Sequence, residues 1–328
     1  MLQLTNNIFT TTAHTFVDQA LSTAIYQYTY NEVYSDYVNA IKASVINITR
    51  LTQIPFLPIQ FFKTKKVITN SIFIPKTPIT FTSSGTTGVT TASHIITDIN
   101  IYHQSFTKAF TLYYGNPQQY CILGLLPNYI LSGGSSLVYM VDALIKQSNH
   151  NLSGFYLHNY EQLQQTLIQL QANNQPTILF GVTYALLQFA QLHKLHLPQI
   201  KIIETGGMKG MGEELTRPQV HQYLQEQLGV QVVHSEYGMT ELLSQAYTSG
   251  GEIFTPPNWL KVLVRKPDDP LAVSLTGRGV LNIIDLANVN SCCFIATDDV
   301  GEVFADGSFT VLGRLDNSDI RGCNLLVA

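Results

Sequence analysis

Apolar residues recur along the chain at two different spacings, and these spacings predict its elements. From residue 10 to residue 50, apolar side chains recur every three to five positions, which predicts a helical N-terminal segment. Two prolines, Pro55 and Pro58, end that pattern. From residue 78 onward, short apolar runs typical of strands alternate with amphipathic stretches typical of helices. Alternation of this kind predicts a mostly parallel sheet with helices on both faces.

The alternating pattern gives an expected order of elements. Strands are expected at 79–81, 120–126, 154–157, 177–180, 200–204 and 230–234, and helices at 95–114, 135–146, 160–172, 184–193 and 216–228. Past residue 243 the helical pattern disappears, and short strands are expected at 246–247, 252–254, 261–265, 279–284 and 303–309. The predicted fold class is therefore α/β, with a helical N-terminal segment (1–77), an α/β core (78–243), a small β-rich subdomain (244–312) and a hinge-like C-terminal tail (313–328).

Composition and charge narrow the classes of function. Apolar residues make up 45% of the 328 residues, enough for a sizeable core, and charged residues only 12%, about half the usual share of roughly 25%. With a net charge of −4 and no basic block, electrostatic binding of nucleic acid is not expected. No signal peptide pattern and no apolar run long enough to span a bilayer is visible. Four cysteines without a CxxC pair favour a reducing cytoplasm.

Two glycine-containing segments follow predicted strands and suggest contacts with a ligand. The first is Ser83-Ser84-Gly85-Thr86-Thr87-Gly88, in which backbone N–H groups and hydroxyls are able to surround phosphate oxygens. A surface loop is the simpler reading of such a cluster. The second is Glu204-Thr205-Gly206-Gly207, whose paired glycines would let a flat ring lie against the backbone. An ordinary turn at the end of a strand is the alternative.

Three further segments carry polar or charged side chains. Tyr237-Gly238-Met239-Thr240-Glu241 offers an aromatic face, a hydroxyl and a carboxylate close together, although a buried tyrosine and a solvated glutamate are equally simple readings. Thr297-Asp298-Asp299 is expected to be a carboxylate pair in a turn. Gly313-Arg314-Leu315-Asp316 alone reads as a polar turn. Each segment is a weak signal by itself, so their order along the chain matters more.

Taken together, the five segments resemble the motifs of the adenylate-forming enzymes, which include acyl-CoA synthetases and firefly luciferase. Residues 83–88 resemble the phosphate loop, 237–241 the aromatic-Gly-x-Thr-Glu motif, 297–299 the Thr-Gly-Asp motif with Asp298 in place of glycine, and 313–316 the hinge motif. The resemblance runs from about residue 78 to the end. It implies the large N-terminal domain of that fold, and the end of the chain at Ala328 suggests that the mobile C-terminal domain is lacking.

One branch of the family is especially similar, namely the LuxE-type acyl-protein synthetases. The similar segments are Pro55–Pro58, Leu125-Leu126-Pro127 with Ser135–Tyr139, and Arg321–Leu326. The resemblance implies that a carboxylic acid, expected to be a fatty acid, reacts with ATP to give acyl-adenylate and pyrophosphate. It also implies an acyl-acceptor protein as partner, such as a reductase, an acyltransferase or a carrier protein.

The resemblance also implies a role for each motif residue. The β- and γ-phosphates would be held by Ser83, Ser84, Gly85, Thr86, Thr87 and Gly88, the α-phosphate by Thr240, and the Mg²⁺ ion by Glu241. Tyr237 would stack on adenine opposite Gly206 and Gly207, and Gly238 and Met239 belong to the same motif. Asp299 would bind the ribose, Arg314 would bind the ribose or phosphate, and Asp316 would be the hinge.

Cys323 is the expected acyl acceptor, because LuxE-type proteins carry such a cysteine near the C-terminus. It lies seven residues beyond Asp316, so an extended tail would carry its sulfur roughly 25 Å. A thiolate is a suitable nucleophile toward an acyl-adenylate. The alternative is a buried thiol in an apolar tail.

Two departures from the family pattern keep other functions open. Val89 follows the phosphate loop where a lysine is usual, and the catalytic lysine of the C-terminal domain is lacking. Three outcomes are open: Arg314 or Arg321 compensates for the missing lysines, a partner helps, or adenylation is slow. Two alternative functions also remain: an acyl- or aryl-CoA ligase resembling phenylacetate-CoA ligases, and a non-catalytic nucleotide- or acyl-binding protein.

Overall fold

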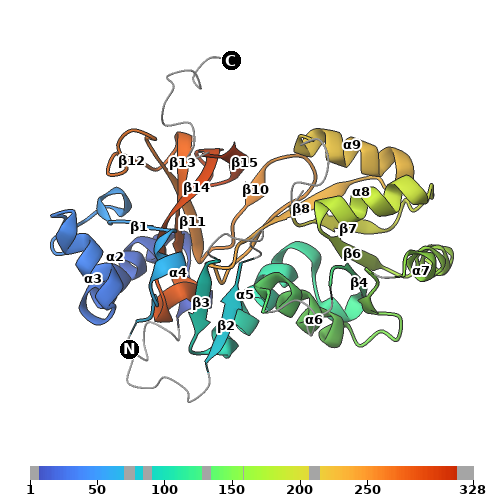
Figure 1. The fold of residues 1–328 in the computed structure, drawn as a ribbon, viewed down its shortest axis with the longest axis horizontal. Coiled ribbons are helices and arrows are strands. Elements are labelled where there is room, and N and C mark those ends of the chain that lie inside the picture. The colour runs from blue at the N-terminus through green and yellow to red at the C-terminus, as the bar shows by residue number, and fades with distance from the viewer. Residues whose placement is uncertain are drawn as a thin grey trace.

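Two groups of strands share one long sheet in the computed structural model, with helices packed around it (Figure 1). The structure describes residues 7–69, 78–83, 91–127, 134–157, 159–206 and 215–315. Its helices are α2 (Ala13–Tyr30), α3 (Glu32–Ala40), α4 (Phe61–Thr64), α5 (Ile99–Tyr114), α6 (Ser136–Ser148), α7 (Tyr160–Ala172), α8 (Thr183–Leu192) and α9 (Arg217–Leu228), with 3-10 helices η1 (Ile8–Thr10), η2 (Leu51–Gln53), η3 (Pro117–Gln119) and η4 (Leu286–Asn290).

The strands form one large sheet and one separate hairpin. Their bounds are β1 (Leu57–Pro58), β2 (Ile79–Thr82), β3 (Ser93–Ile96), β4 (Cys121–Leu125), β5 (Gly154–Phe155), β6 (Thr177–Gly181), β7 (Lys201–Glu204), β8 (Val233–Tyr237), β9 (Ala246–Thr248), β10 (Phe254–Thr255), β11 (Leu260–Arg265), β12 (Val273–Ser274), β13 (Gly277–Asp285), β14 (Phe294–Val303) and β15 (Phe309–Arg314). The large sheet has the order β12-β11-β13-β14-β15-β10-β9-β8-β7-β6-β4-β5, with β1 beside β14, while β2 pairs with β3.

The parallel half of the sheet confirms the α/β prediction. Strands β5, β4, β6, β7 and β8 are neighbours and run parallel. Figure 1 shows α8 and α9 on one face of these strands and α5 and α6 on the other. Every residue of β4 and β6 is buried, as expected for strands covered on both faces. The carboxyl ends of β7 and β8 therefore lie side by side, where such sheets bind ligands.

The antiparallel half continues the same sheet through β9. Strand β9 pairs antiparallel with β8 and with β10, and β10 pairs with β15, so the hydrogen bonding has no break between the halves. This connection brings β14 and β15 toward the end of β8, although they are far away in sequence. The division into a core and a separate β-rich subdomain stays a prediction.

Several predicted boundaries are wrong, and local chemistry explains them. The helical pattern of 10–50 ends at Ala40. The helix expected from residue 95 starts at Ile99, because the side chain of Asp98 accepts the N–H of Asn100 as its cap, and Ser93–Ile96 pair with β2 instead. The strand expected at 303–309 is a turn: Phe304 N–H bonds the carbonyl of Ser308 at 2.9 Å, and Gly307 has φ +86°.

Among the described residues, no helix is both long enough and apolar enough to cross a bilayer.

Candidate active site

Three side chains from three strands meet at the junction of the two halves of the sheet. The hydroxyl of Tyr237 donates to Asp299 Oδ2 at 2.7 Å, and Arg314 Nε donates to Asp299 Oδ1 at 2.9 Å. Asp299 and Arg314 are direct partners across β14 and β15. The Asp299 residue is 6% exposed, whereas the Arg314 side chain is 67% exposed. A buried carboxylate therefore holds an aromatic ring and a solvent-facing cation together.

Tyr237 ends β8, so its position follows from the sheet. Its ring packs against Phe254 and Phe309, with ring centroids 5.8 and 5.4 Å away. Burial, reinforced by the charge of Asp299, raises the pKa of the Tyr237 phenol well above its usual range. The hydroxyl therefore keeps its proton and donates a hydrogen bond to Asp299. The strand expected at 230–234 is in fact displaced toward this motif, since β8 begins at Val233.

The two neighbouring aspartates do not form the carboxylate pair expected from the sequence. Residues 297–299 lie inside β14 rather than in a turn, and successive residues of a strand point to opposite faces. The side chain of Asp298 accordingly points away from that of Asp299. Gln60 Nε2 donates to both of its carboxylate oxygens, each at 2.7 Å. The two carboxylates therefore have separate surroundings, and only Asp299 joins Tyr237 and Arg314.

Glu241 lies close to this cluster and is 7% exposed. Burial raises the pKa of its carboxyl, and the charge of Asp299 adds to the effect, whereas the charges of Arg314 and Lys63 lower it. These influences place the four charged groups in one electrostatic neighbourhood. A buried carboxylate of this kind has lost hydration without a full replacement, so it favours a cation nearby.

Gly206 follows β7 at the level where Tyr237 ends β8. Glu204 pairs with Ser235 in these strands, and Gly206 and Tyr237 each lie two residues further on. Gly206 has φ +74°, and a Cβ added there would meet no atom within 4 Å. Its N–H donates to Glu204 Oε1 at 2.8 Å, which fixes the turn. Among the described residues, the space that a side chain at Gly206 would fill is therefore open.

The remaining motif residues divide into two groups. Gly238 and Met239 continue from Tyr237 into Thr240, and Met239 packs against the core. Ser83 binds the start of β3, because its hydroxyl accepts the N–H of Ala92 at 2.9 Å. Ser84, Gly85, Thr86, Thr87, Gly88, Gly207, Asp316 and Cys323 lie outside the described residues.

The described cysteines are poor candidates for a nucleophile. Cys121, Cys292 and Cys293 are buried and free. Burial raises the pKa of Cys121 to about 11 and that of Cys292 to about 12, so neither carries much thiolate near neutrality.

Sequence reasoning missed three side chains that bind motif residues. Gln60 binds Asp298, His94 binds the carbonyl of Thr240, and Asn288 binds the carbonyl of Glu241. The sequence offered no signal for Gln60 or Asn288, because their partners lie 238 and 47 residues away. For His94 the only signal was its position just after the phosphate-loop-like segment.

Solved structures with a similar fold include two that have ATP bound. The structure of "ATP bound MatB from Rhodopseudomonas palustris" aligns with a TM-score of 0.53 and 16% identity, covering 72% of this chain and 47% of that one. The ATP-bound "RpMatB-BxBclM chimera B3" aligns with a TM-score of 0.52 and 15% identity, with the same coverage. At this identity the likeness shows the fold alone, and it confirms the predicted adenylate-forming fold. The chain spans about half the length of these two structures.

A family model decides the relationship. A comparison with curated proteins gives no match. The model described as "Acyl-protein synthetase, LuxE" matches residues 10–328, nearly the whole chain. This chain therefore belongs to the LuxE acyl-protein synthetase family.

Proposed function

We propose that this protein activates a carboxylic acid with ATP to give an acyl-adenylate and pyrophosphate, and then transfers the acyl group to a thiol. The observation that carries the proposal is the meeting of Tyr237, at the carboxyl end of the parallel strand β8, with Asp299 and Arg314, close to the buried carboxylate of Glu241. Membership of the LuxE family supports the same chemistry.

The nucleoside would bind between Tyr237 and Gly206. The open space at Gly206 would accept one face of adenine, and the Tyr237 ring would cover the other face. Asp299 would accept the ribose hydroxyls, and Arg314, which donates to Asp299, would face the ribose or the α-phosphate. Tyr237 and Arg314 orient the Asp299 carboxylate before the ligand arrives, so little reorganisation is needed on binding.

Glu241 would hold Mg²⁺, and its surroundings fit that ion. Its carboxylate is buried, and this burial is the largest cause of its raised pKa, so a hard cation would compensate the charge. The described residues contain no cluster of three or more acidic, histidine or cysteine ligands. This pattern suits Mg²⁺, which binds through one or two carboxylates together with phosphates and water. Bound there, the ion would neutralise phosphate charge during transfer.

The chain's own residues would align the reactants. Thr240 would donate its hydroxyl to the α-phosphate, and residues 83–88 would donate backbone N–H groups and hydroxyls to the β- and γ-phosphates. A carboxylate oxygen of the acid then bonds to the α-phosphorus while the bond to pyrophosphate breaks. Arg314 and Lys63 are cations whose charges lower the pKa of Glu241. They are therefore candidates to supply the positive charge that a lysine after the phosphate loop usually supplies in the family.

The second step would use Cys323. The thiolate sulfur bonds to the acyl carbon, the bond from that carbon to the AMP oxygen breaks, and AMP leaves with the electron pair. The thioester would then pass its acyl group to a partner protein. The high thiol pKa values of the buried cysteines leave Cys323 as the most suitable acceptor.

Replacing Asp299 with asparagine is expected to raise KM for ATP by about 10- to 100-fold, because a hydrogen bond to a charged group contributes about 1.5–3 kcal/mol. Steady-state pyrophosphate exchange at varied ATP measures this. Asp298→Asn is the matched control, because Asp298 directly precedes Asp299 in β14 but its carboxylate binds Gln60. If both substitutions raised KM for ATP equally, the result would contradict a role of Asp299 in binding the nucleotide.

Pyrophosphate exchange with carboxylic acids of graded length tests the proposed function. Exchange that depends on one class of acid, with a gain of acyl mass on the protein, is the expected result. Release of AMP driven by coenzyme A would instead indicate a CoA ligase. Nucleotide binding without exchange for any acid would indicate a non-catalytic binding protein.

A further inference from the structure

Two side chains from distant parts of the chain bind consecutive carbonyl groups of the Thr240-Glu241 segment. His94 Nδ1, on β3, lies 2.8 Å from the carbonyl oxygen of Thr240. Asn288 Nδ2, in η4, donates to the carbonyl oxygen of Glu241 at 2.8 Å. We call His94 and Asn288 the carbonyl clamp. The clamp touches the backbone of the two residues whose side chains were assigned above to phosphate and metal.

The direction of the His94 bond fixes where its proton lies. A carbonyl oxygen only accepts, so Nδ1 must carry the hydrogen, and in the neutral ring Nε2 is then an acceptor. The ring is 0% exposed and packs edge-on against Phe62, with centroids 5.5 Å apart. Burial lowers the pKa of His94 to about 4, so the ring is neutral near neutrality. His94 therefore acts as a fixed, uncharged donor.

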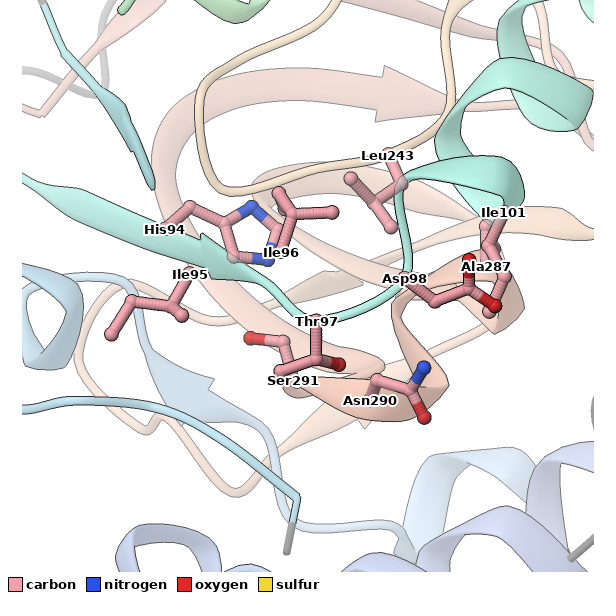
Figure 2. A pocket seen from close by; sticks show the side chains of 10 residues that line it. All are labelled: His94, Ile95, Ile96, Thr97, Asp98, Ile101, Leu243, Ala287, Asn290 and Ser291. Carbon is pink, nitrogen blue, oxygen red and sulfur yellow. The ribbon is translucent and has the colours of Figure 1, made fainter. Parts of the chain in front are cut away.

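A small cavity lies beside His94 (Figure 2). It is lined by His94, Thr97 and Leu243, and by Ala287, Asn290 and Ser291 from η4 and the residue after it. Its volume is about 10 Å³, room for one water molecule. His94 Nε2 and Thr97 Oγ1 are buried and have no hydrogen-bond partner among the described residues. A water here would donate to Nε2 and orient the ring from its second nitrogen.

The backbone just after the clamp is held as well. Asp285 Oδ2, at the end of β13, accepts the N–H groups of Leu243 and Ser244 at 2.8 and 3.0 Å. Residues 240–244 are thus bound through carbonyls at one end and N–H groups at the other. The clamp is the part of this support that bears on Thr240 and Glu241 directly.

We propose that His94 and Asn288 are positioning residues for adenylation: by binding the carbonyls of Thr240 and Glu241, they fix the directions of the Thr240 hydroxyl and the Glu241 carboxylate. This inference rests on the proposed function of those two side chains. A displacement of about 1 Å in such groups lowers a rate by about 100-fold, while the ligand contacts of Tyr237, Asp299 and Arg314 stay in place. The clamp therefore acts on kcat more than on KM for ATP.

A pair of amide substitutions tests the role of His94. The amide nitrogen of asparagine occupies nearly the position of Nδ1, whereas that of glutamine occupies nearly the position of Nε2. His94→Asn is expected to keep kcat for acid-dependent pyrophosphate exchange within about 5-fold of the unmodified protein. His94→Gln is expected to lower kcat by about 10- to 100-fold with KM for ATP changed less than about 3-fold. Thermal unfolding checks that both variants fold alike.

Hydrogen–deuterium exchange of the peptide covering residues 240–244 gives a readout without turnover. Faster exchange in His94→Gln than in His94→Asn is expected. Equal kcat for the two variants, or a loss confined to KM, would overturn the positioning role. If the unmodified protein exchanged no pyrophosphate with any acid, the proposed function would fail. Equal deuterium uptake in the two variants would then still count against the clamp by itself.

Discussion

Replacing Glu241 with glutamine is expected to lower the rate of acid-dependent pyrophosphate exchange by about 100- to 1000-fold. Glutamine keeps the size of the side chain, and the backbone carbonyl that binds Asn288 is unchanged. The substitution removes the negative charge that we assign to Mg²⁺, and a neutral amide is a much weaker ligand for a hard cation. Exchange measured over a range of Mg²⁺ concentrations should show both a lower maximum and a higher requirement for the metal.

Although Glu241→Gln should lower the exchange rate, it should not lower the stability of the protein. Burial raises the pKa of the Glu241 carboxyl, which means that the folded state disfavours its charged form. Glu241→Gln should therefore unfold at the same temperature as the unmodified protein or higher at neutral pH. Glu252→Gln, an exposed glutamate after β9, is the control and should leave the rate unchanged. Full activity of the Glu241→Gln protein at low Mg²⁺ would contradict the role of Glu241 as a metal ligand.

Replacing Cys323 with serine is expected to abolish covalent retention of the acyl group while pyrophosphate exchange continues. Exchange needs only the first step, whereas the thioester needs a thiolate, and a serine hydroxyl is far less ionised near neutrality. Intact-mass measurement after incubation with ATP, Mg²⁺ and the acid reports the acylated fraction. Hydroxylamine, which cleaves thioesters, should remove the added mass from the unmodified protein.

Cys121→Ala provides the control for Cys323. Cys121 is buried in β4 and its thiol pKa is raised to about 11, so its loss should leave acylation unchanged. Acyl mass that persists in Cys323→Ser would identify another acceptor. Loss of exchange together with acylation would mean instead that residue 323 serves the first step.

Much of the fold was predictable because it depends on patterns that are local in sequence. The alternation of short strands with amphipathic helices between residues 120 and 237 is visible in the spacing of apolar residues. The starts expected for α6, α7, α8 and α9 lie within one residue of the observed starts, and only that of α5 was misplaced. The helix expected at residue 95 begins at Ile99, because pairing of Ser93–Ile96 with β2 competes with a helical pattern that looks equally good.

The candidate site was predictable only as far as its motifs are contiguous. Tyr237, Thr240 and Glu241 are close in sequence, and the family pattern relates them to Asp299 and Arg314. The long strand β14 was missed, so the opposite directions of Asp298 and Asp299 could not be foreseen. His94 and Asn288 act through contacts between distant segments, which no local pattern encodes.

Transfer of oxygen from the acid to AMP tests acyl-adenylate formation most directly. The protein is incubated with ATP, Mg²⁺ and an acid whose two carboxyl oxygens are ¹⁸O, and AMP is analysed by mass spectrometry. Attack of the carboxylate on the α-phosphate, followed by breakage of the acyl carbon–oxygen bond, predicts AMP that carries one ¹⁸O atom. Acid-dependent AMP without ¹⁸O, or ADP as the nucleotide product, would contradict the proposed reaction.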